Sequence, residues 1–222
     1  MNRRAFTRLA LSGAGLAALS PSMAAAALAD VTDGTPQVPL PRPVPLVPGT
    51  GINLELLDRA RAALDRHGPA FALRDRVALA DFAMASKAMR FHIVDLIDGR
   101  TSSYLVSHGR GSDPDHSGWL QHFSNVPDSL ATSAGAYKTG QIYDGVHGAA
   151  MRLIGLDPMN SNAEARAIVI HGAAYATEDH IARWGKLGRS EGCLAVAPHI
   201  LPQVLGMLGP GRLVYADKIT AA

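Results

Sequence analysis

One stretch of the chain joins a buried strand to a reactive side chain, and the fold must accommodate both. Residues 167–170 read Ala-Ile-Val-Ile, an apolar and β-branched run that predicts a buried strand. His171 follows this strand directly. Cys193, the only cysteine in the 222 residues, ends the sequence Ser-Glu-Gly-Cys at 190–193. We therefore expect one imidazole and one thiol on the two sides of a single loop.

Cys193 and His171 have the chemistry of a nucleophile and its base. A cysteine nucleophile needs a nearby base or cation that favours its thiolate, and backbone N–H groups aimed at the oxyanion that forms. Gly192 has no side chain to block a carbonyl, so the N–H groups of Gly192 and Cys193 are predicted to form an oxyanion hole, and Ser190 to brace the turn. By residue type alone, a lone cysteine is more commonly a small buried hydrophobic side chain.

These motifs resemble the signature of the YkuD-type L,D-transpeptidases of peptidoglycan, and are most similar to their murein L,D-transpeptidase subgroup. The resemblance rests on His171-Gly172 and Ser190-x-Gly192-Cys193 and covers about residues 91–196. Further blocks in the same order are Val106-Ser107-His108-Gly109, Phe123-Ser124-Asn125, Ser133-Ala134-Gly135, Tyr143-Asp144-Gly145-Val146-His147-Gly148 and Leu153-Ile154-Gly155-Leu156. Two positions depart from the wider family. Glu191 replaces a frequent histidine, and Ala195 replaces an arginine or asparagine that often contacts the substrate carboxylate.

The resemblance implies a fold and a reaction. The expected fold is mainly β with flanking helices, a YkuD-like β-sandwich or barrel-like catalytic domain preceded by a short helical segment. In the expected reaction, the Cys193 thiolate, activated by His171, takes the acyl group of a donor tetrapeptide stem and passes it to an acceptor amine, forming a 3→3 cross-link. The same residues would serve an L,D-carboxypeptidase or endopeptidase that uses water, or attachment of a lipoprotein lysine. A non-catalytic peptidoglycan-binding module is a further alternative.

Substrate binding is predicted for Tyr143, His147, Gly172 and Arg189. The resemblance places the block that holds Tyr143 and His147 beside the catalytic cleft. Arg189 is adjacent to the cysteine turn and is therefore preferred over Arg166 and Arg183 as the cation for a stem-peptide carboxylate. A solvated surface arginine is the alternative for Arg189.

The nine histidines do not form a recognisable metal motif. They are scattered, without an H-E-x-x-H sequence and without a second cysteine for a thiolate pair. We therefore predict no metal and no cofactor, and leave a metal-dependent peptidase as an alternative to the thiol mechanism.

Residues 1–29 are predicted to be a signal peptide of the twin-arginine type. Arg3-Arg4 precedes a short, weakly apolar segment and an alanine-rich cleavage region. The apolar segment is shorter than the ~20 residues of a membrane-spanning helix, so no stable membrane insertion is expected after its removal. The resulting location is the periplasm or cell envelope. An uncleaved anchor is the alternative.

The rest of the chain carries almost no net charge. Without residues 1–29 it has 18 Lys and Arg against 19 Asp and Glu, so no basic surface argues for nucleic acid. Residues 30–51 are rich in proline and are predicted to be an extended linker.

Residues 52–88 are predicted to form a helical segment that packs on a catalytic domain at 89–222. Apolar spacing indicates one helix ending at Gly68-Pro69 and a second that begins at Asp75. From residue 91 the apolar period changes to two, and Asp98-Gly99 predicts a hairpin turn. Further strands are expected at 136–138, 141–143, 150–154, 166–170 and 212–216, with a short helix at 198–208.

Overall fold

The computed structural model describes residues 51–146 and 148–219. The predicted signal peptide, the predicted linker up to residue 50, and His147 lie outside the described residues. Among the helices of the described residues, none combines the length and the apolar composition that crossing a membrane requires.

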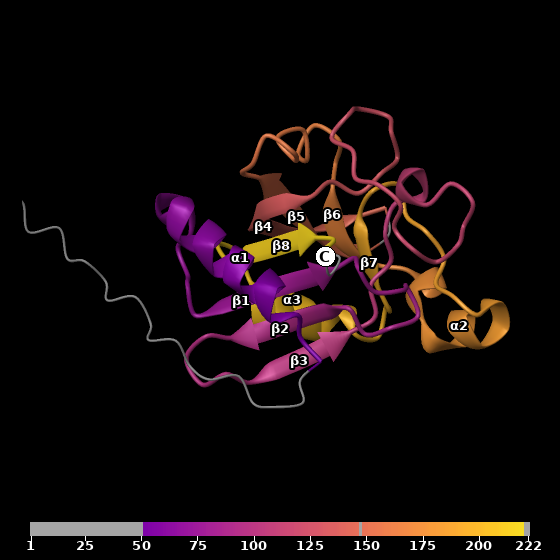
Figure 1. The fold of residues 1–222 in the computed structure, drawn as a ribbon, viewed down its shortest axis with the longest axis horizontal. Helices are drawn as coiled ribbons and strands as arrows, with labels where there is room; N and C mark the ends of the chain where they lie inside the picture. The colour runs from indigo at the N-terminus through magenta and orange to yellow at the C-terminus, as the bar shows by residue number, and fades with distance from the viewer. Residues whose placement is uncertain (1–50, 147, 220–222) are drawn as a thin grey trace, which may run out of the picture. The chain divides into compact units, whose positions relative to one another are not determined.

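Eight strands form one sheet, in the order β3-β2-β1-β8-β4-β5-β6-β7 (Figure 1). The strands are β1 Arg76–Asp81, β2 Phe91–Asp95, β3 Thr101–Tyr104, β4 Gly135–Gly145, β5 Gly148–Gly155, β6 Val169–Gly172, β7 Leu194–Val196 and β8 Leu213–Asp217. In the described part of the chain, the α-helices beside the sheet are α1 Leu54–Arg66, α2 Glu178–Trp184 and α3 Leu201–Leu208. Short 3-10 turns, η1 Gly68–Ala70, η2 Arg110–Ser112 and η3 Ala174–Ala176, lie in the connections.

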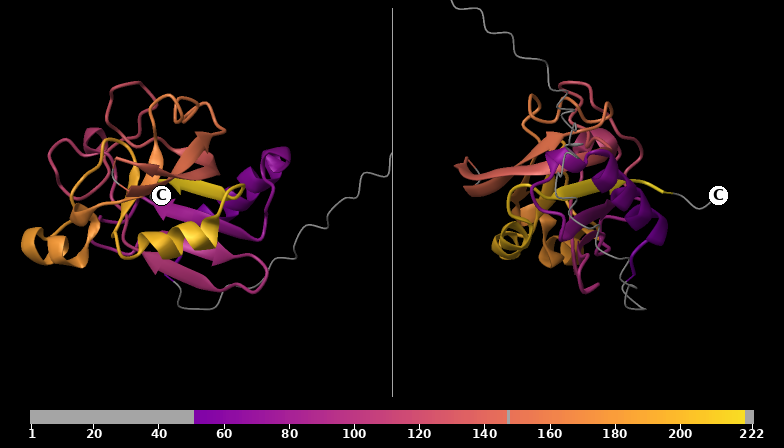
Figure 2. Two further views of the ribbon diagram at one scale, coloured as in Figure 1. Left: turned by 180° about the vertical axis from the view of Figure 1, so that it is seen from behind. Right: turned by 90° about the vertical axis from the view of Figure 1, so that its left-hand side faces the viewer.

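Helices α1 and α3 cover opposite faces of the sheet. Successive side chains of a strand point to opposite faces, and in β1 Val77 and Leu79 pack in the cluster that contains the buried side of α1. Ala78 and Ala80 pack in the cluster that contains α3. Figure 1 shows α1 on the near side of the sheet, and the view from behind on the left of Figure 2 shows α3 on the near side.

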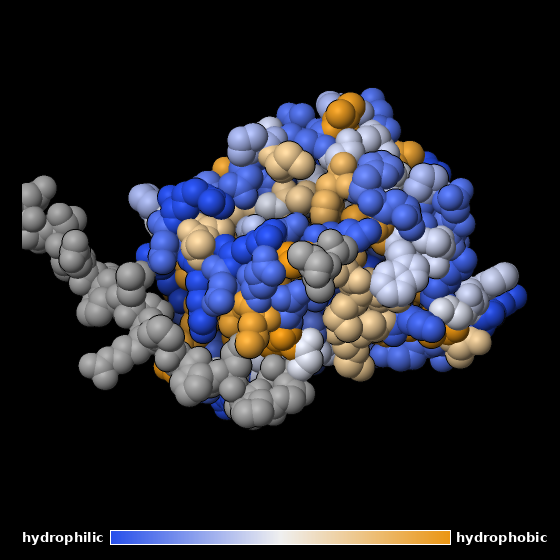
Figure 3. All heavy atoms as spheres, viewed as in Figure 1, coloured by the Kyte–Doolittle hydropathy of each residue, from blue (hydrophilic) through white to orange (hydrophobic). Residues whose placement is uncertain are grey.

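Helix α1 confirms the first predicted helix. The side chain of Asn53 caps the first turn, because its Oδ1 accepts a hydrogen bond from Leu56 N–H over 3.2 Å. The buried side of the helix consists of Leu56, Leu57, Ala60, Ala63 and Leu64. Its outer side, turned to the viewer in Figure 3, is mainly hydrophilic. The helix thus has the apolar stripe that packing on a sheet requires.

The second predicted helix is wrong, because residues 76–81 form strand β1. Val77 and Ala80 have helical spacing, yet every residue from 77 to 81 is buried, as in a strand covered on both faces. β1 runs antiparallel to β2 and parallel to β8, and it pairs with both. Since β8 lies near the other end of the chain, long-range pairing overrides the local helical pattern.

The predicted hairpin is confirmed, whereas other strand boundaries differ. β2 and β3 pair in antiparallel, and Gly99 has the positive φ, 75°, that the turn requires. The strand predicted from Arg166 begins only at Val169, because residues 161–167 form turns and Ala167 has a φ of 52°. The strands predicted at 136–138 and 141–143 are one strand, β4, with an irregularity between Thr139 and Ile142.

The chain that follows β3 connects the two ends of the sheet. Ser107 N–H donates to the carbonyl of Ala195 in β7 over 2.8 Å. Next to it, Ser190 N–H donates to the carbonyl of His108 over 2.9 Å, and Arg110 N–H donates to that of Ser190 over 2.8 Å. These bonds draw the open sheet toward a barrel, and the predicted class, mainly β with flanking helices and a helix ahead of the strands, is confirmed.

Candidate active site

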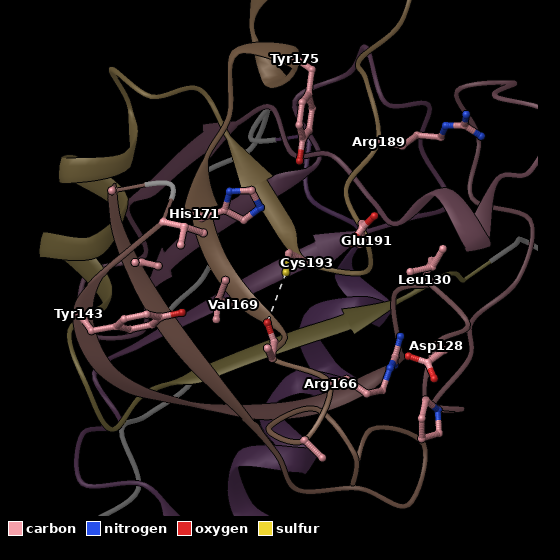
Figure 4. A pocket seen from close by; sticks show the side chains of 17 residues that line it. Asp128, Leu130, Tyr143, Arg166, Val169, His171, Tyr175, Arg189, Glu191 and Cys193 are labelled. Carbon is pink, nitrogen blue, oxygen red and sulfur yellow. Dashed lines mark hydrogen bonds between the residues drawn. The ribbon is translucent and has the colours of Figure 1, made fainter.

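A cavity of about 630 Å³ contains both Cys193 and His171 (Figure 4). Its walls come from the tip of the β4–β5 hairpin, strand β6, the turn before β7, and the segments 127–130 and 165–167. A pocket of this size matches those that bind small organic ligands and peptide segments. The two residues singled out in the sequence therefore share one accessible site.

His171 lies in β6, and Cys193 lies directly before β7, the strand that pairs with β6 in parallel. In the register of β6 and β7, His171 pairs with Ala195, two residues after Cys193. Side chains two positions apart on a strand lie on the same face. The parallel pairing thus brings the end of the cysteine turn beside β6, and both side chains line the same cavity, although the loop between them contains α2.

The tautomer of His171 follows from its backbone contact. The Nδ1 atom lies 3.1 Å from the carbonyl oxygen of Gly172, and a carbonyl only accepts hydrogen bonds. Nδ1 therefore carries a hydrogen, and in the neutral imidazole the lone pair is on Nε2. A general base needs that lone pair.

The thiol of Cys193 is half-buried and donates to the carbonyl of Ala167, with Sγ 3.6 Å from the oxygen (Figure 4). Burial raises the pKa of this thiol, and the charge of Glu191 raises it further. A hydrogen bond from the backbone of Val169 and the charge of Arg166 lower the same pKa. Because burial is the largest of these effects, the resting group is a thiol that a base must deprotonate.

The turn before Cys193 requires glycine and depends on Ser190. Gly192 has a φ of 116°, and a Cβ there would lie 2.8 Å from the carbonyl oxygen of Ala131 and 2.8 Å from Ile168. The Ser190 hydroxyl donates to the Cys193 carbonyl over 2.7 Å and accepts from Gly192 N–H over 3.2 Å. Ser190 therefore braces the turn, and the Gly192 N–H that was predicted to face an oxyanion is bonded to it in this structure.

Thr132 and Gly109 support the turn from behind. The Thr132 hydroxyl donates to the Gly192 carbonyl over 3.1 Å and accepts from Gly109 N–H over 2.9 Å. Thr132, Gly109 and Gly192 are all buried, so the cysteine turn packs against protein and not against solvent.

Arg166 lies in the cavity wall as a half-buried cation. Its Nη1 donates to the Ser124 carbonyl over 2.8 Å, and its Nη2 donates to the Ser129 hydroxyl over 3.3 Å and to the Ala131 carbonyl. Within residues 51–146 and 148–219, no ion pair of at most 4.0 Å includes this guanidinium. Its charge acts on Cys193 without a compensating carboxylate.

Arg189 and Tyr143, two of the predicted substrate contacts, both line the cavity. Arg189 lines the cavity, but its guanidinium donates to the carbonyls of Asp113 and Pro114 and points away from Cys193 in Figure 4. Tyr143 also lines the cavity, and the guanidinium of Arg152 lies 4.6 Å from the centre of its ring.

Gly172 is not in the cavity wall. A Cβ added at Gly172 would lie 3.2 Å from the Cα of Pro198, which shows that its face is turned toward the start of the C-terminal helix. Its contribution to the site is the carbonyl that binds His171. His147 lies outside the described residues.

Tyr175 is a wall residue that sequence reasoning missed. Burial raises its pKa to about 12, and the charges of Cys193 and Glu191 raise it as well, so the phenol is neutral and able to donate. Gly188 packs against its side chain, where a Cβ would lie 2.5 Å from that of Tyr175. Asp128 and Leu130 are wall residues that no motif marked, whereas the 97% exposed Val146 belongs to the motif block that begins at Tyr143.

A buried polar network lies behind the cysteine turn. Arg90, which is fully buried, donates from Nη2 to Nδ1 of His108 over 2.7 Å, and Nε2 of His108 lies 3.3 Å from a carboxylate oxygen of Asp113. Since arginine only donates, Nε2 carries the hydrogen and donates to Asp113. Burial, together with the charge of Arg90, lowers the pKa of His108 to about 3. His108 is therefore a neutral link between two buried charges.

Metal binding finds no support in the part of the chain that the structure describes. There, no group of three or more His, Cys, Asp or Glu side chains is arranged to hold an ion.

The comparison of sequences gives one family. Residues 49–216 match the family described as "L,D-transpeptidase catalytic domain". No curated protein sequence matches the chain significantly.

Solved structures with similarity to the chain include an L,D-transpeptidase from Mycobacterium smegmatis, at 13% identity and a TM-score of 0.41, covering 64% of this chain and 58% of that one. An L,D-transpeptidase from Mycobacterium tuberculosis has 15% identity and a TM-score of 0.42, covering 65% of this chain and 58% of that one. The helical cell shape determining protein Pgp2 from Campylobacter jejuni has 14% identity and a TM-score of 0.44, covering 66% and 48%. The chain thus spans less than two thirds of each of these proteins.

Proposed function

Because the chain belongs to the L,D-transpeptidase catalytic-domain family, we propose that it is a peptidoglycan L,D-transpeptidase with Cys193 as nucleophile and His171 as base. The observation that carries the proposal is the shared cavity, whose wall includes His171 of β6 and Cys193, which directly precedes the neighbouring strand β7. The bond from Nδ1 of His171 to the Gly172 carbonyl leaves the basic lone pair on Nε2.

In the first half of the reaction, Nε2 of His171 takes the thiol proton and Sγ of Cys193 forms a bond to the carbonyl carbon of the L-centre of diaminopimelate in a donor tetrapeptide stem. The negative charge of the tetrahedral intermediate is stabilised by the N–H of Cys193, joined by that of Gly192 when its bond to Ser190 is released. The C–N bond to D-alanine then breaks, and the imidazolium returns its proton to the leaving amine. A thioester remains.

In the second half, the amine of an acceptor stem attacks the thioester carbon. His171 accepts the amine proton and transfers it to the departing sulfur, which restores the thiol and leaves a 3→3 cross-link. If water replaces the amine, the same steps give a tripeptide stem and no cross-link. The acceptor therefore distinguishes a transpeptidase from an L,D-carboxypeptidase.

The experiment that tests the proposal incubates the purified chain with disaccharide tetrapeptides and identifies the products by mass spectrometry. A dimer linked through two diaminopimelates, absent with Cys193→Ala and with His171→Gln, is the expected result. Release of D-alanine without dimers would assign hydrolysis instead. His199→Gln, which changes an exposed histidine, is the matched control and retains activity.

Intact-mass measurement with a carbapenem separates an enzyme from a binding module. We expect one covalent adduct on the wild type and none on Cys193→Ala. A folded wild type that forms no adduct and turns over no tetrapeptide would contradict the proposal and favour a peptidoglycan-binding module.

The proposal also includes export to the periplasm or cell envelope by the twin-arginine route. Its support is the sequence of residues 1–29, in particular Arg3-Arg4. A fusion of this segment to a reporter is expected to be exported, and replacement of both arginines by lysine is expected to abolish that export. Retention of the unchanged fusion in the cytoplasm would refute this part of the proposal.

A further inference from the structure

Arg166 has a charge that the described part of the protein does not neutralise. The other cations near the cavity differ from it. Arg110 is paired with Glu191 at 2.8 Å, and Arg189 is directed away from the thiol. Its hydrogen bonds go to carbonyl and hydroxyl oxygens, which carry no net charge, so they solvate the guanidinium without neutralising it. Such a cation in a cavity wall is a natural partner for an anionic ligand.

The guanidinium is also fixed in position. Its three bonds to the segment 124–131 use part of its five N–H donors and prevent the long side chain from moving freely. An arginine that is already ordered loses little conformational entropy when a ligand binds. Arg166 is therefore prepared to bind before any substrate arrives.

The position of Arg166 relates the ligand to the reacting sulfur. Both residues line the same cavity, and a Cβ built on Gly192, directly before Cys193, would lie 3.3 Å from Nη2 of Arg166. The charge of Arg166 accordingly lowers the pKa of Cys193. The carboxylates that also line the cavity are Glu191, which is exposed and bound to Arg110, and the exposed Asp128. Neither lies within ion-pair distance of Arg166 among the described residues.

We propose that Arg166 forms an anion subsite beside Cys193, which binds a carboxylate of the acyl-donor substrate. The inference deepens the proposed function, on which its substrate rests, since a stem peptide that ends in D-alanine and contains diaminopimelate offers carboxylates near the carbonyl under attack. The resemblance leads one to expect an arginine or asparagine that contacts the substrate carboxylate two residues after the cysteine. This chain has Ala195 there. Arg166 supplies the cation from the turn that precedes β6.

Two alkylating reagents test the subsite without any turnover. Iodoacetate is anionic and iodoacetamide is neutral, and both react with the same thiolate, so the ratio of their rates at one pH cancels the fraction of thiolate. An anion subsite raises the iodoacetate to iodoacetamide ratio. We expect Arg166→Gln to lower this ratio by about threefold to tenfold, the effect of a partly screened charge pair.

Three further variants distinguish charge from structure. Arg166→Lys keeps the charge and should keep most of the ratio. Ser129→Ala removes one of the bonds that position the guanidinium and should change the ratio by less than about twofold, as should Arg189→Gln. An unchanged ratio in folded Arg166→Gln overturns the proposal, and a fall in Arg189→Gln alone assigns the subsite to Arg189 instead.

Substrate kinetics complete the test. For wild type, amidation of the donor carboxylates should raise KM by about threefold to tenfold, and Arg166→Gln should remove most of that discrimination. If no muropeptide is turned over but the alkylation ratio depends on Arg166, the proposed function fails and the subsite remains. If turnover occurs and neither the ratio nor the discrimination depends on Arg166, the subsite fails and the function remains.

Discussion

Gly109 and Gly192 lie backbone to backbone behind Cys193. A Cβ built on Gly109 would come within 2.7 Å of the Cα of Gly192 and within 2.3 Å of the carbonyl oxygen of Leu130. The φ of Gly109 is −69°, which any residue adopts. Glycine is therefore needed at this position because a side chain would clash with the neighbouring backbone, and not because of the backbone conformation. The segment after β3 thus sets the position of the cysteine turn.

Gly109→Ala tests this contact. Because backbone atoms cannot move aside as a side chain does, we expect a loss of about 1–3 kcal/mol in the free energy of unfolding and at least a tenfold fall in the rate of Cys193 acylation. Denaturant unfolding and carbapenem adduct formation measure the two effects. Gly206→Ala is the control. Nothing lies within 4 Å of its added Cβ, so the helix should gain slightly in stability at normal acylation.

The raised pKa of Cys193 predicts the pH dependence of its alkylation. Burial and Glu191 favour the protonated thiol, so the rate with iodoacetamide should rise with a midpoint above the ~8.5 of an ordinary cysteine. Glu191→Gln removes the opposing charge and should move the midpoint to lower pH. Arg166→Gln should move it to higher pH. A midpoint well below 8 in the wild type would show that the resting group is already a thiolate.

What the sequence predicted is mostly local. The end of the first helix before Gly68-Pro69, the Asp98-Gly99 turn and the glycine before Cys193 act through neighbours a few residues away, and each was readable from the chain. Strand β1 was not, since its identity depends on pairing with β8 more than a hundred residues later. The sequence offered Arg166 only as one of three candidate arginines. Its fixed position in the cavity wall could not be predicted, because it depends on hydrogen bonds to the folded segment 124–131.

Helix α1 belongs to the core of the described fold, which predicts how its substitution acts. Leu57 is 1% exposed and packs with Val77 and Leu213, so Leu57→Ala should lower the free energy of unfolding by about 2–5 kcal/mol. Leu54, which is 61% exposed on the same helix, is the matched control, and Leu54→Ala should cost less than ~0.5 kcal/mol. Equal effects in urea unfolding would show that α1 is not packed on the sheet as described.

His108 predicts a loss of stability on acidification. Its pKa in the folded protein is about 3, against ~6.5 in the unfolded chain. Between these values the unfolded chain binds a proton at His108 that the folded protein does not, so the free energy of unfolding falls as the pH falls from about 6.5 toward 3. The slope from this group approaches one proton. Asp113, whose pKa is lowered in the fold, adds to the slope at the acid end.

Urea unfolding at several pH values measures that slope. His108→Gln removes the titrating group, and we expect the dependence between about pH 6.5 and pH 4 to become shallower by about one proton, even though Arg90 and Asp113 lose their link and the variant is less stable at neutral pH. His108→Asn should behave in the same way. His199→Gln, at an exposed position, should keep the slope of the wild type. If His108→Gln keeps that slope too, His108 is protonated in the fold, and the buried chain from Arg90 to Asp113 is an arrangement of three charges.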